Sequence, residues 1–417
     1  MPRAVVVILD GVRRDSVTPE LMPCVSAFTA GASRFAAHRS VFPSATRVVS
    51  SSMATGCFPA RHGLQGKTVV LVEGGRLVRR DAGLPDFLQH RRTVTGTSLA
   101  MPTMAQRLAP HGGAIIFSNV SPGAAYTHDP DGHGHVYHRA GSFGPGRVPL
   151  ADGLDIECDI AGDRVMTDRF IAALPHAAAL SMIWMGEPDH IQHAVPLGSP
   201  EHLAVLRAAD AHAGMVITAV AGLRQAGEDV LLIVASDHGH ETVSGVVDVE
   251  GALVAAGLKA AMDSGDVVSA ANGTGCLIYV HPDERARIPA IGAFLRAQPW
   301  AGRVFDATDL AEVGQSAAGA LAFAVAMQSG LEPNAHGVPG QSLVAMPPDG
   351  KPDRLGCGQH GGLGVWEQSP FLMIAGRGFT AGAVCAEPTS AVDIAPTVLA
   401  HLGVAAPALD GRALSLL

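Results

Sequence analysis

The sequence predicts an α/β fold, in which a doubly wound, mostly parallel sheet carries a small inserted α+β lid subdomain. Three observations lead to this prediction. Short apolar runs bounded by polar turns are typical of strands that are covered on both faces. Helical patterns lie between these runs, and alternating strands and helices favour a parallel sheet. One stretch, residues 251–339, departs from this alternation.

The elements of the main sheet follow one another along the chain. Strands are expected at residues 4–9, 113–117, 179–184, 229–235 and 371–374. Helices are expected at residues 48–56, 200–219 and 392–402. In an open sheet of this kind, ligands bind at the carboxyl ends of the strands.

Residues 251–339 are predicted to form the lid subdomain. Within them the pattern indicates three strands and one helix, at residues 276–280, 303–305, 320–326 and 284–296, respectively. The Gly- and Pro-rich residues 334–340 are the expected return hinge. The rest of the chain, residues 1–250 and 340–417, is expected to form the main domain.

The composition excludes two classes of protein. The chain has 417 residues, of which 29 are Lys or Arg and 38 are Asp or Glu, so its formal net charge is −9. Nucleic-acid binding needs clustered basic residues, so a nucleic-acid partner is not expected. Charged residues make up only 16% and hydrophobic residues 47%, which argues against a disordered chain.

Nothing in the sequence predicts a membrane association. No apolar run approaches the roughly 18 residues of a membrane span, and residues 4–9 are too short for the apolar region of a signal peptide. The six cysteines are scattered without a CxxC pair, which predicts reduced thiols in a cytoplasmic protein. The oligomeric state is left open.

Acidic residues and histidines stand next to the predicted strands, where a ligand site is expected. Six of them are candidate metal ligands: Asp10, Asp189, His193, Asp237, His238 and His360. A single Asp at a strand end is usually a helix cap, so the prediction depends on all six together. Mixed Asp and His ligands suit Zn²⁺ or another transition metal. Six ligands suit two ions, which can clamp a phosphoryl group. His240 is expected to support one of the ligands.

A hydroxyl nucleophile is expected just before the helix at residues 48–56. Ser44 and Thr46 both lie there, and a helix N-terminus favours an ionising hydroxyl and a bound phosphate. Thr46 could equally be a plain helix cap. The spacing alone does not choose between the two hydroxyls.

The motifs together resemble the type I phosphodiesterase/nucleotide pyrophosphatase family of the alkaline phosphatase superfamily. The likeness covers nearly the whole chain outside the insertion and includes the tail at residues 390–397 and 409–412. The segments that carry it are Ile8-Leu9-Asp10-Gly11, Phe42-Pro43-Ser44-Ala45-Thr46, Ala54-Thr55-Gly56 with Pro59 and His62-Gly63, Glu187-Pro188-Asp189 with His193, Ser236-Asp237-His238-Gly239 and His360-Gly361-Gly362.

This resemblance implies a role for each matching residue. Thr46 matches the nucleophile that becomes phosphorylated. The ligands of one zinc match Asp189, His193 and His360. The ligands of the other match Asp10, Asp237, His238 and the Thr46 oxygen. The resemblance implies a di-metal hydrolase of phosphoric esters, most simply a phosphodiesterase. Two Zn²⁺ ions are the expected cofactors, with other divalent transition metals as alternatives.

Two departures from the family pattern bear on the substrate. Lys67 stands where the family usually has an Asn that donates to a phosphoryl oxygen. A lysine there is a point charge that would favour a dianion. Arg47 stands where nucleotide pyrophosphatases carry an aromatic that stacks on a base. Arg47 is expected to clamp an anionic group or to be a surface charge.

The substrate is therefore expected to be a small phosphate ester or a phosphonate. A phosphonate hydrolase and a phosphomonoesterase remain alternatives to the phosphodiesterase, as does a metal-binding protein without turnover. Residues 126–138 contain four histidines and are predicted to form a loop. This loop either overhangs the site or is a solvated turn.

Overall fold

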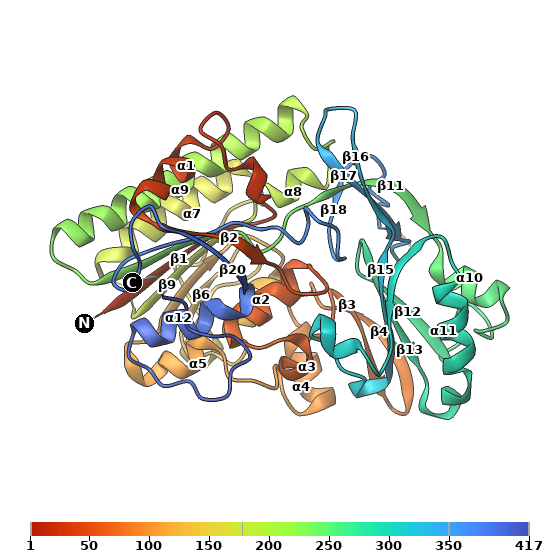
Figure 1. The fold of residues 1–417 in the computed structure, drawn as a ribbon. Coiled ribbons are helices and arrows are strands. Elements are labelled where there is room, and N and C mark those ends of the chain that lie inside the picture. The colour runs from red at the N-terminus through yellow and green to blue at the C-terminus, as the bar shows by residue number, and fades with distance from the viewer. Residues whose placement is uncertain (1, 177, 349–350, 416–417) are drawn as a thin grey trace.

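The computed structural model describes residues 2–176, 178–348 and 351–415. A ten-stranded sheet runs through the larger part of the molecule (Figure 1). Its strands, in spatial order, are β20 (Val384–Ser390), β2 (Ser33–Arg39), β19 (Leu372–Ala375), β10 (Val230–Ala235), β1 (Arg3–Leu9), β9 (Leu180–Met185), β5 (Ala114–Ser118), β6 (His135–Tyr137), β7 (Phe143–Gly144) and β8 (Val148–Pro149).

The centre of this sheet is parallel, as predicted. Strands β10, β1, β9, β5 and β6 pair in parallel with one another, whereas β6 and β7 are antiparallel. Strand β19 is an exception, because it runs antiparallel to both β10 and β2. The expectation of a parallel strand at residues 371–374 is wrong in direction. An apolar run that is buried on both faces carries no information about the direction of its strand.

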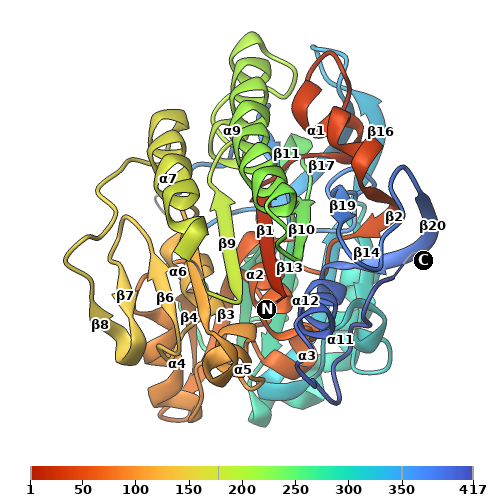
Figure 2. The ribbon, with the colours of Figure 1, turned by 90° about the vertical axis from the view of Figure 1, so that its left-hand side faces the viewer.

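Helices cover both faces of the sheet, which is therefore doubly wound (Figure 2). Side chains of β1 alternate between the two layers, since Val5 and Val7 face one core and Val6 and Ile8 the other. The first layer consists of α1 (Pro23–Phe28), α7 (Ile160–Ala173) and α9 (Pro200–Gln225). The second includes α2 (Thr46–Thr55), α3 (Pro59–His62), α4 (Phe87–Thr95), α5 (Met104–Leu108), α6 (Pro122–Ala125) and α12 (Ile394–His401).

Helix α9 runs six residues past its predicted end. Contrary to the sequence expectation, it is long and apolar enough to cross a membrane by those two criteria alone. Its apolar residues Leu206, Ala213 and Val216 are buried against the sheet. The helix therefore occupies the position of a core helix.

A second, antiparallel sheet lies beside the first, with α10 (Val249–Ala255) and α11 (Ile288–Arg296) on its outer side (Figure 1). Its strands are β12 (Val267–Ala271), β13 (Gly275–Val280), β15 (Leu321–Met327) and β14 (Ala301–Phe305). The hairpin of β3 (Thr68–Glu73) and β4 (Arg76–Asp81) packs on it through Val70 and Leu77. The helix predicted at 284–296 is divided, because a 3-10 segment precedes α11.

A third sheet connects the other two near the carboxyl ends of the parallel strands. Its strands are β16 (Ser329–Pro333), β17 (Pro339–Ala345), β11 (Glu241–Val247) and β18 (Gly358–Gln359). The predicted hinge at 334–340 forms the turn from β16 into β17. Strand β11 begins directly after His240, and β18 ends directly before His360. Both strands therefore hold candidate ligands in place.

Candidate active site

Two groups of acidic and imidazole side chains meet at the carboxyl ends of neighbouring strands. Asp10 follows β1, Asp237 and His238 follow β10, and Asp189 begins the short helix α8 (Asp189–Gln192) after β9. Strand β1 lies between β10 and β9, so these residues converge at one edge. All six predicted ligands are brought together here.

The first group consists of Asp10, Asp237 and His238, and all three are at most 1% exposed. His238 Nε2 lies 3.0 Å from Asp237 Oδ2 and 3.4 Å from Asp10 Oδ1. The other carboxylate oxygens are held by the fold. Trp184 Nε1 donates to Asp10 Oδ2 at 2.9 Å, and the Gly11 amide donates to Asp237 Oδ1 at 3.0 Å.

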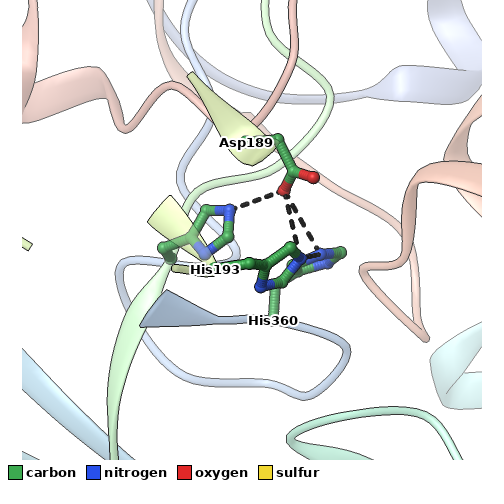
Figure 3. Close-up of side chains that lie close together, drawn as sticks. Asp189, His193 and His360 are labelled. Carbon is green, nitrogen blue, oxygen red and sulfur yellow. Dashed lines mark hydrogen bonds and ion pairs between the residues drawn. The ribbon is translucent and has the colours of Figure 1, made fainter. Parts of the chain in front are cut away.

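The second group consists of Asp189, His193, His240 and His360. In Figure 3 the imidazoles of His193 and His360 turn toward the Asp189 carboxylate. Their Nε2 atoms lie 3.6 and 3.5 Å from Asp189 Oδ1. His240 Nε2 is closer to the same oxygen, at 2.7 Å. His240 thus contacts a predicted ligand, as the sequence suggested, and could also bind an ion itself.

The two groups are immediate neighbours. The rings of His238 and His360 stack with centroids 3.6 Å apart and planes 13° from parallel. His193 Nδ1 donates to the Gly358 carbonyl at 2.9 Å, and His360 Nδ1 donates to the Ser44 carbonyl at 2.6 Å. These bonds leave both Nε2 lone pairs facing the interior of the site.

The buried carboxylates of the first group fit a cation. Asp10 Oδ1 and Asp237 Oδ2 are buried and have no hydrogen-bond donor among the described residues. Burial, followed by the charge of Asp237, raises the pKa of Asp10 well above its usual range. Because an uncompensated buried carboxylate is costly, a metal ion between these oxygens would satisfy both.

The second group is also suited to a metal. Burial works against ionisation of Asp189, but the neighbouring His193 and His240 outweigh it and hold the pKa of Asp189 well below its usual range. Burial lowers the pKa of both His193 and His360 well below the usual value. The group therefore offers an ionised carboxylate and neutral imidazoles, which are the forms that bind metal ions.

The structure separates the two candidate hydroxyls. Thr46 is the first residue of α2, and its Oγ1 lies 3.1 Å from His238 Nε2. It also lines the cavity beside the two groups. Ser44 is fully buried, and its hydroxyl donates to Glu367 instead. Only Thr46 therefore presents its oxygen to a ligand in the cavity.

The cavity has a volume of about 410 Å³, and five basic residues line it beside Asp81, Asp353 and the candidate ligands. Its basic residues are Arg47, Lys67, Arg139, Lys351 and Arg354. Among the described residues that line it, none is Phe, Tyr or Trp. The cavity thus has room for a small anion, and among those residues its rings are histidine imidazoles.

Arg47 and Lys67, both predicted to bind substrate, line this cavity. Burial, followed by the positive charge of Arg47, lowers the pKa of Lys67 to about 7. The Nε of Arg47 is buried without a hydrogen-bond acceptor among the described residues. Both side chains are therefore available to a bound anion. Lys351 and Arg354 were not predicted, because their charges stand in a Pro-rich stretch that has no pattern of its own.

The histidine-rich residues 126–138 do not overhang the site, since none of them lines the cavity. His128 Nε2 lies 3.1 Å from Ser50 Oγ, and His138 Nε2 lies 2.9 Å from the Val120 carbonyl. Both histidines are buried. His128 thus joins this stretch to α2, His138 joins it to the segment after β5, and the following Arg139 lines the cavity. The prediction of a loop is wrong for His135–Tyr137, which form β6.

Comparison with known proteins identifies the family of the chain. The sequence profile of the type I phosphodiesterase/nucleotide pyrophosphatase family matches residues 4–291. The chain belongs to this family. The family lies in the alkaline phosphatase superfamily, so the chain is a hydrolase of phosphoric ester bonds. A comparison with curated proteins found no match at the sequence level.

Solved structures of low sequence identity share the fold of this phosphodiesterase-family chain. Murine ectonucleotide pyrophosphatase/phosphodiesterase 5, an inactive variant in complex with AMP, is 15% identical with a TM-score of 0.69, and the match covers 99% of this chain and 98% of that one. Phosphonoacetate hydrolase from Sinorhizobium meliloti, in complex with phosphonoformate, is 16% identical with a TM-score of 0.66, and the match covers 97% and 96%.

Proposed function

We propose that this chain is a zinc-dependent phosphodiesterase that hydrolyses small phosphate esters through a phosphothreonine at Thr46. The observation that carries the proposal is the position of Thr46 Oγ1, 3.1 Å from His238 Nε2 and open to the basic cavity. Family membership supports the reaction class. The choice of zinc follows from the donor set, which is made of imidazoles and carboxylates without thiolates.

Two ions would be held by the residues described above. Asp189, His193 and His360 would hold one ion, while Asp10, Asp237, His238 and the Thr46 oxygen would hold the other. Such ions neutralise the charge of a phosphoryl group and lower the pKa of a hydroxyl that they touch. The ligand atoms of each group lie within 4.8 Å of one another, which supports this division.

The bond-making and bond-breaking steps begin at Thr46. The Thr46 oxygen attacks phosphorus, and the bond between phosphorus and the leaving oxygen breaks. The leaving group takes up a proton and departs as an alcohol. Water then attacks the phosphothreonine, which releases phosphate or a phosphomonoester and restores the Thr46 hydroxyl. The N-terminus of α2, together with Arg47 and Lys67, binds the non-bridging oxygens of the phosphoryl group.

A phosphonate or phosphomonoester substrate is the second candidate, and the wall of the cavity favours it. A dianion gains more than a diester from the cluster of Arg47, Lys67 and Arg354, and the absence of Phe, Tyr and Trp from the described lining residues argues against a nucleotide. A neighbour in fold binds phosphonoformate, which is a small anion.

We also propose that residues 251–339 act as the lid over residues 1–250 and 340–417. Ala271 and Gly273 belong to this segment and line the cavity. Because both are small, they bound the space for the leaving group without making a polar contact to it.

The test is metal content together with a substrate panel. Wild-type protein is expected to bind two zinc ions and to release p-nitrophenol from bis-p-nitrophenyl phosphate, p-nitrophenyl phosphate or a phenyl phosphonate ester. Thr46→Ala should abolish turnover and retain metal. Thr55→Ala is the matched control, because Thr55 lies on the same helix and bonds only to the Ser51 carbonyl. A fully active Thr46→Ala protein would refute the nucleophile.

A further inference from the structure

Glu367 is a buried carboxylate that accepts an unusual number of hydrogen bonds. The residue is 1% exposed. Four donors reach Oε2, and they are the Ser44 hydroxyl at 3.0 Å, the Thr274 hydroxyl at 2.6 Å and the amides of Gly361 and Gly362 at 2.7 and 2.8 Å. The Gly364 amide reaches Oε1 at 2.9 Å.

These donors come from separate parts of the site. Ser44 lies two residues before Thr46, and its carbonyl accepts the bond from His360 Nδ1. Gly361 and Gly362 follow His360 directly. The backbone carbonyl of Glu367 also accepts from the Gly239 amide at 2.9 Å, next to His238. One residue therefore connects the turn of the nucleophile with the segments that carry both histidines.

The fourth connection leads to the second sheet through Thr274. Residues 272–275 and 360–362 touch there through their backbones. A Cβ on Gly361 would lie 1.7 Å from the Asn272 carbonyl oxygen, and one on Gly273 would lie 2.1 Å from the His360 carbonyl oxygen. The Thr274 amide also donates to the His360 carbonyl at 3.3 Å. Glu367 therefore lies at a place where two backbone segments are in direct contact, with no side chain between them.

A neighbouring carboxylate shows what an ordinary buried glutamate does here. Glu241 is also fully buried, but its side chain accepts only from the Ser342 hydroxyl and the Trp366 amide. Neither partner belongs to a segment that carries Thr46, His238 or His360. Of these two buried glutamates, Glu367 is thus the one whose carboxylate accepts hydrogen bonds from the segments around Thr46 and His360.

We propose that Glu367 is a positioning residue for the hydrolytic reaction, which sets the placement of the Thr46 turn against the His360 ligand. This inference rests on the proposed roles of Thr46 and His360. Glu367 does not touch the substrate, because it does not line the cavity. It acts through Ser44. The Glu367 carboxylate accepts a hydrogen bond from the Ser44 hydroxyl, and the Ser44 carbonyl orients the His360 imidazole.

The test compares Glu367→Gln with Asp393→Asn. Asp393 is a buried carboxylate at the start of α12 that accepts the Ser390 and Arg412 amides and does not line the cavity. Zn²⁺ affinity is measured by competition with a chromophoric chelator, kcat and KM with p-nitrophenyl esters, and thermal stability by the melting temperature. For Glu367→Gln we expect zinc affinity at one of two sites and kcat each to fall roughly 10- to 100-fold, the usual cost of losing a group that orients a ligand. KM should change little. Asp393→Asn should keep wild-type zinc affinity and kcat.

Milder variants serve if Glu367→Gln fails to fold. Thr274→Val and Ser44→Ala each remove one of the five bonds, and each should lower kcat in a soluble protein. Wild-type zinc affinity and kcat in Glu367→Gln, or in both milder variants, would overturn the inference. So would an equal loss in Asp393→Asn. If wild-type protein binds no zinc or Thr46→Ala stays active, it is the proposed function that fails.

Discussion

The guanidinium of Arg47 occupies the space that a side chain on Gly83 would fill. A Cβ on Gly83 would lie 2.2 Å from Arg47 Nη2. Gly83 follows the end of β4, so the β3–β4 hairpin determines where this guanidinium lies in the cavity. The position of the Arg47 charge, which we propose binds the substrate, thus depends on Gly83, a residue that does not line the cavity.

Gly83→Ala should therefore mimic the loss of Arg47. The new methyl group displaces the guanidinium, and a lost charge-assisted hydrogen bond to an anion costs about 1.5–3 kcal/mol. We expect KM for the preferred p-nitrophenyl ester to rise about 10- to 100-fold. Gly222→Ala, at a helical position with open space around it, should leave KM unchanged. An unchanged KM in Gly83→Ala would place Arg47 outside the binding site.

The pH dependence of substrate binding should depend on Lys67. Its pKa is lowered to about 7 by burial and by Arg47, so its positive charge is present below that pH and is lost above it. We expect KM for an anionic ester to rise between pH 6 and pH 8.5 in wild-type protein. In Lys67→Asn this part of the pH profile should disappear. Monoester turnover should fall more than diester turnover, since a monoester carries more charge.

A pH profile of KM that is the same in wild-type protein and in Lys67→Asn would contradict this assignment. The ratio of diester to monoester kcat/KM gives a second readout from the same assays. An unchanged ratio would show that Lys67 does not contact the phosphoryl oxygens.

Removal of the metal should make the free energy of unfolding depend on the ionisation of Asp10. In the metal-free protein, burial and the charge of Asp237 raise the pKa of Asp10 in the folded state. Between the lower pKa of the unfolded state and this raised pKa, the folded state therefore keeps a proton on Asp10 that the unfolded state has released. The stability from Asp10 is present at acid pH and is lost as the pH rises toward the folded pKa. Chelator-treated Asp10→Asn should therefore become more stable than chelator-treated wild type as the pH rises, by about 1.4 kcal/mol per pH unit in that interval.

Urea unfolding of both metal-free proteins at a series of pH values measures this difference. Zinc should reverse the order of stability, because wild type gains an ion that Asp10→Asn binds poorly. A stability difference that does not change with pH would mean that the pKa of Asp10 is not raised in the metal-free folded state.

The parallel strands explain why the convergence of the candidate ligands could be predicted from the sequence. Asp10, Asp237 and His238 follow apolar runs, and the direction of such strands brings their ends together. The direction of β19 could not be predicted, because its run has the same pattern in either direction. Glu367 was missed for another reason. A glutamate among glycines looks solvent-exposed by composition, and only the fold supplies the amides and hydroxyls that replace water.

The lengths of the predicted elements were least accurate where tertiary packing decides them. Helix α9 extends to Gln225 because its apolar face continues along the sheet. The histidine-rich stretch was interpreted by its composition, whereas His128 and His138 are buried and hydrogen-bonded to Ser50 and to Val120 and Ala140, respectively. A count of histidines does not show which way they face.

The backbone contact between residues 272–275 and 360–362 limits which positions of this chain can be changed by directed evolution. Gly273 and Gly361 have no room for any other amino acid, so libraries that randomise them will consist mostly of misfolded variants. Selection for new leaving groups is better aimed at Arg354 and Arg139, whose side chains already border open volume.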